Sequence, residues 1–243
     1  MVSLIEEASM VSAWIITKVK ESGAKGVVVG LSGGIDSSLV AVLSRRAVGD
    51  NLLGLIMPCH SNPTDIEHAG ILAKKFSIRT QTIDLAPVYA LMVKVLPEGI
   101  DIARANLKPR LRMITLYYFA NSLGYLVAGT DNKTESFTGY FTKYGDGGVD
   151  ILPISHLLKR QVRAMARELG VPDEIITKPP SAGLWEGQTD EGEMGITYEE
   201  LDTIIAGIES GNTEGLNPAL VKKAKRMHAS TEHKRRLPPS FPD

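Results

Sequence analysis

GVVVGLSGGIDSS, residues 26–38, is the stretch on which the fold of this chain depends. Its three consecutive valines lack helical period and are bounded by glycines, so they predict a short parallel strand that is buried on both faces. The glycines then break the strand, and an apolar pattern with helical spacing begins after Ser37 and Ser38. The glycines therefore lie at the turn from a strand into the N-terminus of a helix.

Such a turn predicts an anion site, because unpaired backbone N–H groups and the positive end of the helix dipole point into it. Asp36 would repel a phosphate unless a divalent cation lay between them, so it indicates Mg²⁺. No lysine follows the glycines as in G-x-x-x-x-G-K-[ST], which argues against a Walker-type kinase or GTPase. The alternative is a glycine-rich turn with an N-capping serine.

The composition fits one large α/β domain over residues 1–243. The 27 basic and 28 acidic residues give no electrostatic reason to expect nucleic acid or an anionic membrane as a partner. Cys59 is the only cysteine, which excludes an intramolecular disulfide and indicates a reducing compartment, so we expect a cytoplasmic protein. The sequence shows neither a signal-peptide pattern nor an apolar run near the ~20 residues that cross a bilayer.

Strand and helix patterns alternate along the chain. Strands are predicted at 27–29, 52–57, 78–83 and 125–129. Helices are predicted at 4–19, 64–76, 87–96, 101–123, 154–170, 198–209 and 218–227. Pro109 should kink or restart its helix. The alternation predicts a doubly wound, mostly parallel sheet of about five strands flanked by helices, with a nucleotide at the carboxyl ends of the strands.

A second polar loop, TDNKTESFTGYFTKYGDGGVD at residues 130–150, follows the strand at 125–129. It is dense in Thr, Asp, Lys and Tyr, as is typical of a loop that contacts substrate. Glu135 would be a second oxygen ligand for a magnesium ion facing Asp36, while Lys143 and Asp150 could position an anionic group and a sugar hydroxyl. A solvated surface loop is the alternative.

Two other features have a plain interpretation beside a functional one. Cys59 and His60 invite a nucleophile or metal site but lack further ligands, so an ordinary βα loop that could touch adenine is favoured. The apolar side of helix 101–123 could be core or the interface of a dimer.

Several motifs together carry a specific resemblance. S-G-G-x-D-S after a strand resembles the pyrophosphate loop of the ATP pyrophosphatases, which cleave ATP between its α and β phosphates to adenylate a substrate. With this loop, six further motifs make the chain, from about residue 26 to 236, similar to the bacterial and archaeal NAD⁺ synthetase family in its ammonia-dependent form. They are LKPRLRM (107–113), GTDNKTE (129–135), GYFTKYGDGG (139–148), LLKRQVR (157–163), KPPSAGLWEGQTDE (178–191) and EHKRR (232–236). Ile35 stands where many members carry Gln, but its side chain can point away from the phosphate.

The resemblance implies a ligase that amidates the nicotinate carboxylate of deamido-NAD⁺ with ammonia through an acyl-adenylate, giving NAD⁺, AMP and diphosphate. It implies ATP as co-substrate and a homodimer with the dinucleotide near the subunit interface. The residues it places on ATP are Gly30, Leu31, Ser32, Gly33, Gly34, Ile35, Asp36, Ser37, Thr130, Lys159 and Ser181. It places Mg²⁺ on Asp36 and Glu135, deamido-NAD⁺ on Arg110, Lys143, Asp150, His233 and Lys234, and the catalytic roles on Asp36 and Lys159.

Two segments near the end of the chain are predicted to act on the site. Residues 178–195, rich in Pro, Gly and acidic residues, suit a mobile cover, with a permanently ordered loop as the alternative. The basic run in the tail at 229–243 would by itself indicate a solvated tail, and only the resemblance assigns its His233 and Lys234 to the dinucleotide.

Three other functions are alternatives to this one. A GMP synthetase and a tRNA-thiolating enzyme use similar loops, but thiolation ordinarily needs more cysteines than Cys59. A nucleotide sensor without turnover is the third. One cysteine and only about 25 residues ahead of the loop leave no room for a glutaminase domain, so free ammonia is the expected nitrogen donor.

Overall fold

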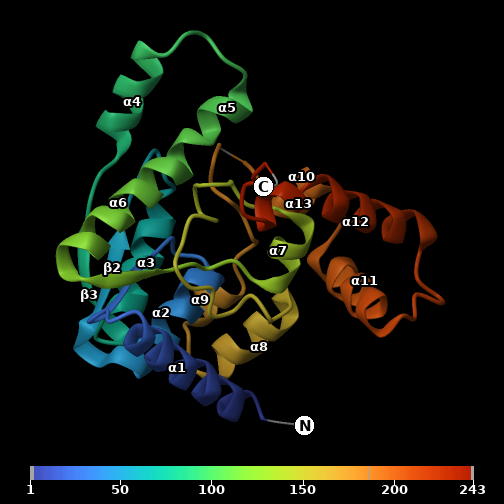
Figure 1. Ribbon diagram of the computed structural model, residues 1–243, viewed down its shortest axis with the longest axis horizontal. Helices are drawn as coiled ribbons and strands as arrows, with labels where there is room; N and C mark the ends of the chain where they lie inside the picture. Colours follow the sequence, from blue (N-terminus) through green and yellow to red (C-terminus); the bar gives the residue numbers. More distant parts are fainter. Residues whose placement is uncertain (1–2, 186, 242–243) are drawn as a thin grey trace.

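The computed structural model describes residues 3–185 and 187–241, which are arranged around a parallel sheet (Figure 1). Its four strands lie in the order β3-β2-β1-β4. Their bounds are β1 Gly26–Gly30, β2 Leu52–Ile56, β3 Arg79–Thr82 and β4 Tyr125–Ala128. In the register, Val27 is opposite Leu52 on one side and Leu126 on the other, so the strand predicted from three valines is central.

Helices connect and flank these strands. They are α1 Leu4–Glu21, α2 Ile35–Val48, α3 Pro63–Lys75, α4 Ala86–Val95, α5 Asp101–Ala105, α6 Leu107–Leu123, α7 Lys133–Thr138, α8 Lys159–Glu168, α9 Asp173–Ile176, α10 Asp190–Met194, α11 Tyr198–Ser210, α12 Pro218–Ser230 and α13 Glu232–Arg235, with a 3₁₀ turn at Gly49–Asn51. No helix among the described residues is long and apolar enough to cross a membrane. The cytoplasmic location stays a prediction.

Both faces of the sheet are covered. Val27 and Val29 pack into a cluster with α1, α2 and α8, while Val28 packs into a second cluster with Ala120 of α6. All three valines have no exposed surface. The run is apolar without alternation because neither face of β1 meets water, which confirms the predicted fold class.

The strand order creates the crevice that the site occupies. The chain leaves β1 through α2 to reach β2 on one side, and later returns to place β4 on the other side of β1. The loops after β1 and β4 therefore diverge at the carboxyl edge of the sheet. This is the topological switch point at which open parallel sheets bind ligands.

The C-terminal helices form a separate layer. Met194, Tyr198, Leu201, Val221 and Ala224 of α10, α11 and α12 make a third apolar cluster, against which Phe137 of α7 packs. Figure 1 shows α11 and α12 beyond α7, away from the sheet. This layer stands behind the polar loop that follows β4.

Three local predictions differ from the structure or are refined by it. The described residues form four strands rather than about five, because past β4 only Ile151 pairs, with Ala128, and Pro153 then lacks an N–H. The helix predicted at 154–170 begins only at Lys159. The helix predicted at 101–123 breaks at Asn106, so Pro109 lies in the first turn of α6, where its missing N–H has no intrahelical role.

Candidate active site

Serine side chains fix the conformation of the loop after β1 by hydrogen bonds to its backbone. Ser37 Oγ accepts a hydrogen bond from the Ser32 backbone N–H at 3.2 Å and donates to the Gly34 carbonyl at 3.0 Å. Ser32 Oγ accepts from the Gly34 N–H at 3.2 Å. The first N–H groups of α2 have no partner within the helix, so they remain available to an anion. Gly33 has a φ of +76°, and a Cβ there would lie 2.1 Å from the Asp65 carbonyl oxygen, so the turn requires glycine.

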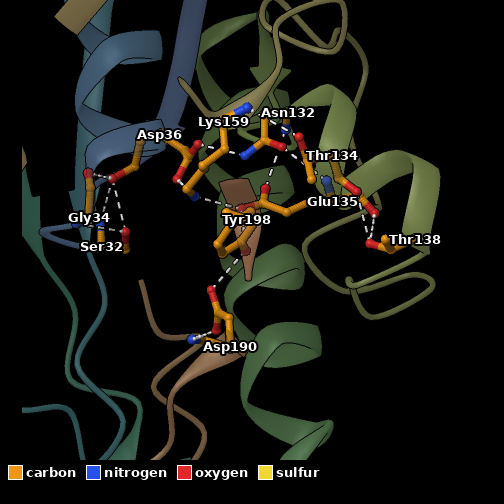
Figure 2. Close-up of polar contacts among 12 residues, drawn as sticks. Ser32, Gly34, Asp36, Asn132, Thr134, Glu135, Thr138, Lys159, Asp190 and Tyr198 are labelled. Atoms are coloured by element: carbon orange, nitrogen blue, oxygen red, sulfur yellow. Dashed lines mark hydrogen bonds and ion pairs between the residues drawn. The ribbon is translucent and has the colours of Figure 1, made fainter. Parts of the chain in front are cut away.

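A buried lysine connects this loop to the loop after β4. The Lys159 ammonium lies 2.6 Å from Asp36 Oδ2 and 2.8 Å from Glu135 Oε1, and the side chain is 2% exposed (Figure 2). Burial opposes the charged form of Lys159, but the two carboxylates outweigh it and raise its pKa above the usual value. Burial, with Asp36 adding to it, raises the pKa of Glu135 to about 7.

Asn132 orients both carboxylates. Its side-chain N–H donates to Asp36 Oδ1 at 2.8 Å, and its side-chain oxygen accepts from the Glu135 N–H at 3.0 Å. Glu135 Oε2 in turn accepts from the Asn132 backbone N–H at 3.3 Å, which completes a capping box at the start of α7. The N-x-x-E spacing in GTDNKTE is a capping-box pattern that could have identified this residue from sequence.

Asp202 of α11 holds α7 and α8 together. Its buried carboxylate accepts hydrogen bonds from Thr134 Oγ1 at 2.5 Å, from the Arg160 N–H at 2.8 Å and from the Lys159 N–H at 3.3 Å. A carboxylate at the N-terminus of a helix is favoured by the helix dipole, so Asp202 determines where α8 begins. An acid within the apolar pattern Leu201, Ile204 and Ile205 was the available sequence signal.

The two carboxylates suit a magnesium ion. Asp36 and Glu135 present hard oxygen donors, and they already converge on one cation, the Lys159 ammonium. Mg²⁺ in nucleotide sites is commonly held by one or two carboxylates together with phosphate oxygens. No group of three or more His, Cys, Asp or Glu suited to a metal occurs among the described residues, so the protein would supply only part of the coordination.

One large cavity, of about 1140 Å³, joins these parts. It exceeds the usual range for a single drug-sized ligand, so it has room for more than one small molecule. The predicted residues that line it are Gly30, Leu31, Ser32, Gly34, Ile35, Asp36, Ser37, Arg110, Thr130, Glu135, Lys143, Lys159, Ser181, His233 and Lys234. Two predicted contacts are not in that lining. Gly33 lies against the Asp65 backbone of α3. Asp150 accepts from Tyr117 Oη at 2.9 Å and from the Val127 N–H at 2.8 Å.

The predicted dinucleotide residues meet at one side of the cavity. The Lys143 ammonium donates to the His233 carbonyl at 2.6 Å, and Arg110 donates to the Lys143 carbonyl at 3.4 Å. Lys234 donates to the carbonyls of Gly139 and Phe141, each at 2.7 Å. The basic run near the C-terminus is therefore docked beside the polar loop and is not a solvated tail, although its contact with a dinucleotide stays a prediction.

A further carboxylate in the cavity was missed by the sequence reasoning. Asp131 lines the cavity and is only 6% exposed. Burial, with Asp146 and Glu135 contributing, raises its pKa well above the usual value. Both Asp131 and Asp146 lie inside motifs on which the resemblance rests, which was the available signal.

The Cys59–His60 pair belongs to an ordinary loop between β2 and α3, as predicted. Cys59 has no exposed surface, and burial raises the pKa of its thiol, so it lacks the thiolate character of a nucleophile. His60 lines the cavity and its ring meets the edge of Tyr89 at 5.6 Å between centroids. Its predicted contact with adenine is untested.

Comparisons with known proteins agree on one family. The NAD synthase family profile matches residues 7–238. The NH₃-dependent NAD⁺ synthetase of Carboxydothermus hydrogenoformans is 49% identical over 238 residues, which cover 96% of each chain. Among solved structures, NMN synthetase from Francisella tularensis has a TM-score of 0.92 at 36% identity, covering 99% of each chain. The NH₃-dependent NAD synthetase of Campylobacter jejuni has a TM-score of 0.87 at 28% identity, covering 99% of this chain and 100% of that one.

Proposed function

The chain belongs to the NAD synthase family, and we propose that it makes NAD⁺ by amidating the nicotinate carboxylate of deamido-NAD⁺ with ammonia, at the expense of ATP. The observation that carries this proposal is the cluster beside the glycine loop in which the buried Lys159 pairs with the carboxylates of Asp36 and Glu135. This cluster places an ammonium group and two carboxylates, which could respectively neutralise a triphosphate and hold its Mg²⁺, at the carboxyl ends of β1 and β4. It lies in a cavity large enough for two substrates.

The reaction needs activation because a carboxylate is a poor electrophile that cannot expel oxide. Its oxygen attacks the α-phosphorus of ATP, diphosphate leaves, and ammonia then attacks the acyl-adenylate carbonyl and displaces AMP. The N–H groups at the start of α2 would bind the departing diphosphate, and Lys159 would neutralise charge on the phosphates. Mg²⁺ held by Asp36 and Glu135 would, when bound, neutralise further phosphate charge. Most of the protein's contribution is thus positioning and electrostatics.

The nitrogen donor is proposed to be free ammonia. Purified protein with Mg²⁺, ATP, ammonium and deamido-NAD⁺ is expected to form NAD⁺, AMP and diphosphate in equal amounts. Replacing ammonium with glutamine at the same concentration should abolish product, because the one cysteine, Cys59, is fully buried and cannot serve as a glutaminase nucleophile. Equal rates with glutamine after removal of contaminating ammonia would refute the ammonia dependence, and ATP binding without turnover would indicate a sensor.

A mononucleotide is the second candidate substrate. It is favoured by the TM-score of 0.92 with an enzyme named NMN synthetase, since NMN is the nicotinamide half of NAD⁺. The same assay with nicotinate mononucleotide separates the two. Because the curated relatives at 49% identity are NAD⁺ synthetases, kcat/KM is expected to favour deamido-NAD⁺. The reverse order would assign the chain to the mononucleotide.

The active form is proposed to be a homodimer. Asp150, assigned to deamido-NAD⁺ by the resemblance, is absent from the cavity lining, which supports a dinucleotide site completed at a subunit interface. Ile114 and Tyr118, one turn apart on α6, are 59% and 68% exposed and offer apolar surface for such an interface. A monomer by sedimentation at concentrations where the enzyme turns over would overturn this proposal.

Residues 178–195, called the cover segment here, are proposed to close over the reacting groups. Glu186 lies outside the described residues, but Ser181 and Leu184 on one side of it and Gln188 on the other line the cavity. Closure would protect the acyl-adenylate from water. Part of the segment is more regular than its composition suggested, since residues 190–194 form α10 with the Thr189 side chain as cap.

Limited proteolysis tests this proposal. Cleavage within the cover segment is expected to be rapid in free enzyme and slow when MgATP and deamido-NAD⁺ are bound, because substrates add contacts that the segment lacks alone. Cleavage elsewhere in the chain provides the internal control. Complete protection without any substrate would show a permanently ordered loop.

A further inference from the structure

Tyr198, the first residue of α11, contacts both the Asp36–Lys159–Glu135 cluster and the cover segment (Figure 2). Its hydroxyl lies 3.2 Å from Glu135 Oε1 and 3.0 Å from Asp190 Oδ2. The side chain is only 1% exposed, so water cannot readily substitute for either partner. No motif in the sequence pointed to this residue.

The aromatic ring of Tyr198 supports the catalytic lysine as well. The Lys159 ammonium lies 4.7 Å from the ring centroid, within the range of a cation–π contact. Asp202, one turn further along α11, accepts from the Lys159 backbone N–H. One face of α11 therefore positions both the backbone and the charged end of Lys159.

On the other side, Asp190 lies within the cover segment, at the start of α10. Its Oδ1 accepts from the Ala182 N–H at 2.9 Å, next to Ser181, a predicted ATP contact. Ser181 Oγ donates to the Gln188 carbonyl at 2.8 Å, which ties the two described parts of the segment together. A change at the Tyr198 hydroxyl can thus reach the residues that would lie over ATP.

The hydroxyl has one hydrogen and faces two carboxylates, so it can donate to only one of them at a time. Glu135 Oε1 already accepts from the Lys159 ammonium, so a further cation on Glu135 would leave Asp190 as the better acceptor for the Tyr198 hydroxyl. We propose that Tyr198 is a positioning residue that couples cation binding at Asp36 and Glu135 to its hydrogen bond with Asp190 of the cover segment. This proposal rests on the proposed ATP chemistry, and it implies that the cover segment is held more tightly when MgATP binds.

The alternative is that Tyr198 only fills the third apolar cluster. Tyr198→Phe separates the two roles, because phenylalanine keeps the ring beside Lys159 and removes only the hydroxyl. Trp185 provides a local readout, since it lies in the cover segment and is 46% exposed. The other tryptophan, Trp14, is on α1, so a Trp14→Phe background leaves emission from Trp185 alone.

MgATP is titrated into this background without deamido-NAD⁺, so the fluorescence result does not depend on the proposed amidation. With Tyr198→Phe, the MgATP concentration that gives half of the maximal change in Trp185 fluorescence is expected to rise about tenfold, as for loss of one hydrogen bond to a charged group. With both substrates, more AMP than NAD⁺ should form because the adenylate escapes to water. Tyr125→Phe, at the start of β4 away from the cavity, is the matched control and should change neither quantity.

Asp190→Ala removes the same hydrogen bond by changing the acceptor. If the proposal holds, Asp190→Ala raises the half-maximal MgATP concentration as Tyr198→Phe does. The double variant then has a half-maximal concentration no higher than that of the poorer single variant. A wild-type response and an AMP:NAD⁺ ratio of one in a folded Tyr198→Phe protein would overturn the proposal. Additive effects of the two changes would overturn it as well. If the unmodified chain makes no NAD⁺, the proposed function fails, while the Trp185 titration still decides the role of Tyr198.

Discussion

Asp36→Asn and Glu135→Gln are each expected to slow adenylation by about 10²–10³-fold, the loss that follows removal of one preorganised electrostatic contact. Each change keeps the shape of the side chain and removes one of the two hard anionic donors. Lys159 retains the other carboxylate as a partner, so the variants should fold. The effect should fall on kcat more than on the KM for deamido-NAD⁺, because the residues proposed to bind deamido-NAD⁺ are Arg110, Lys143, His233 and Lys234 and do not include these carboxylates.

Single-turnover formation of AMP and diphosphate measures this loss directly, with circular dichroism as the check on folding. Glu209→Gln is the matched control, because Glu209 also pairs with a lysine, Lys133, but at the surface. Raising the magnesium concentration should recover part of the activity in both site variants. Near-full activity of either one at ordinary magnesium concentration would remove the basis for a shared metal site.

Lys159→Met is expected to reduce adenylation to a similar or greater extent and also to destabilise the free protein. Breaking a buried ion pair by removing one partner typically costs about 3–5 kcal/mol. Here two partly buried carboxylates, Asp36 and Glu135, would be left facing each other without a cation. For a chain of this length, that loss lowers the melting temperature by about 10 °C.

The melting temperature should therefore depend on magnesium. In EDTA the Lys159→Met protein is expected to melt well below wild type, and millimolar Mg²⁺ should restore much of the difference by occupying the freed carboxylates. Arg160→Met is the control, since Arg160 lies next in the same helix with an exposed side chain. A Lys159→Met protein with wild-type stability in EDTA would contradict the ion-pair geometry described here.

The central strand, the glycine turn and the helix after it follow from the amino-acid sequence alone. The reason is local: consecutive β-branched residues disfavour a helix, and Gly33 adopts a left-handed conformation that other residues resist. The sequence also pointed to Asp36 and Glu135 as candidate site residues, because each lies in a polar loop that follows a strand, whereas Lys159 was assigned only by the resemblance. The resemblance extended the assignment to the dinucleotide residues.

The contacts among these residues depend on segments that are far apart in the chain and meet only in the folded protein. Lys159 pairs with Asp36, 123 positions earlier, and α8 begins where it does because Asp202, 43 positions later, caps it. Tyr198 and Asp150 likewise acquire their partners from distant segments. Local periodicity records which face of an element is apolar, whereas buried hydrogen bonds between segments depend on how the layers pack, and no short-range pattern encodes that packing.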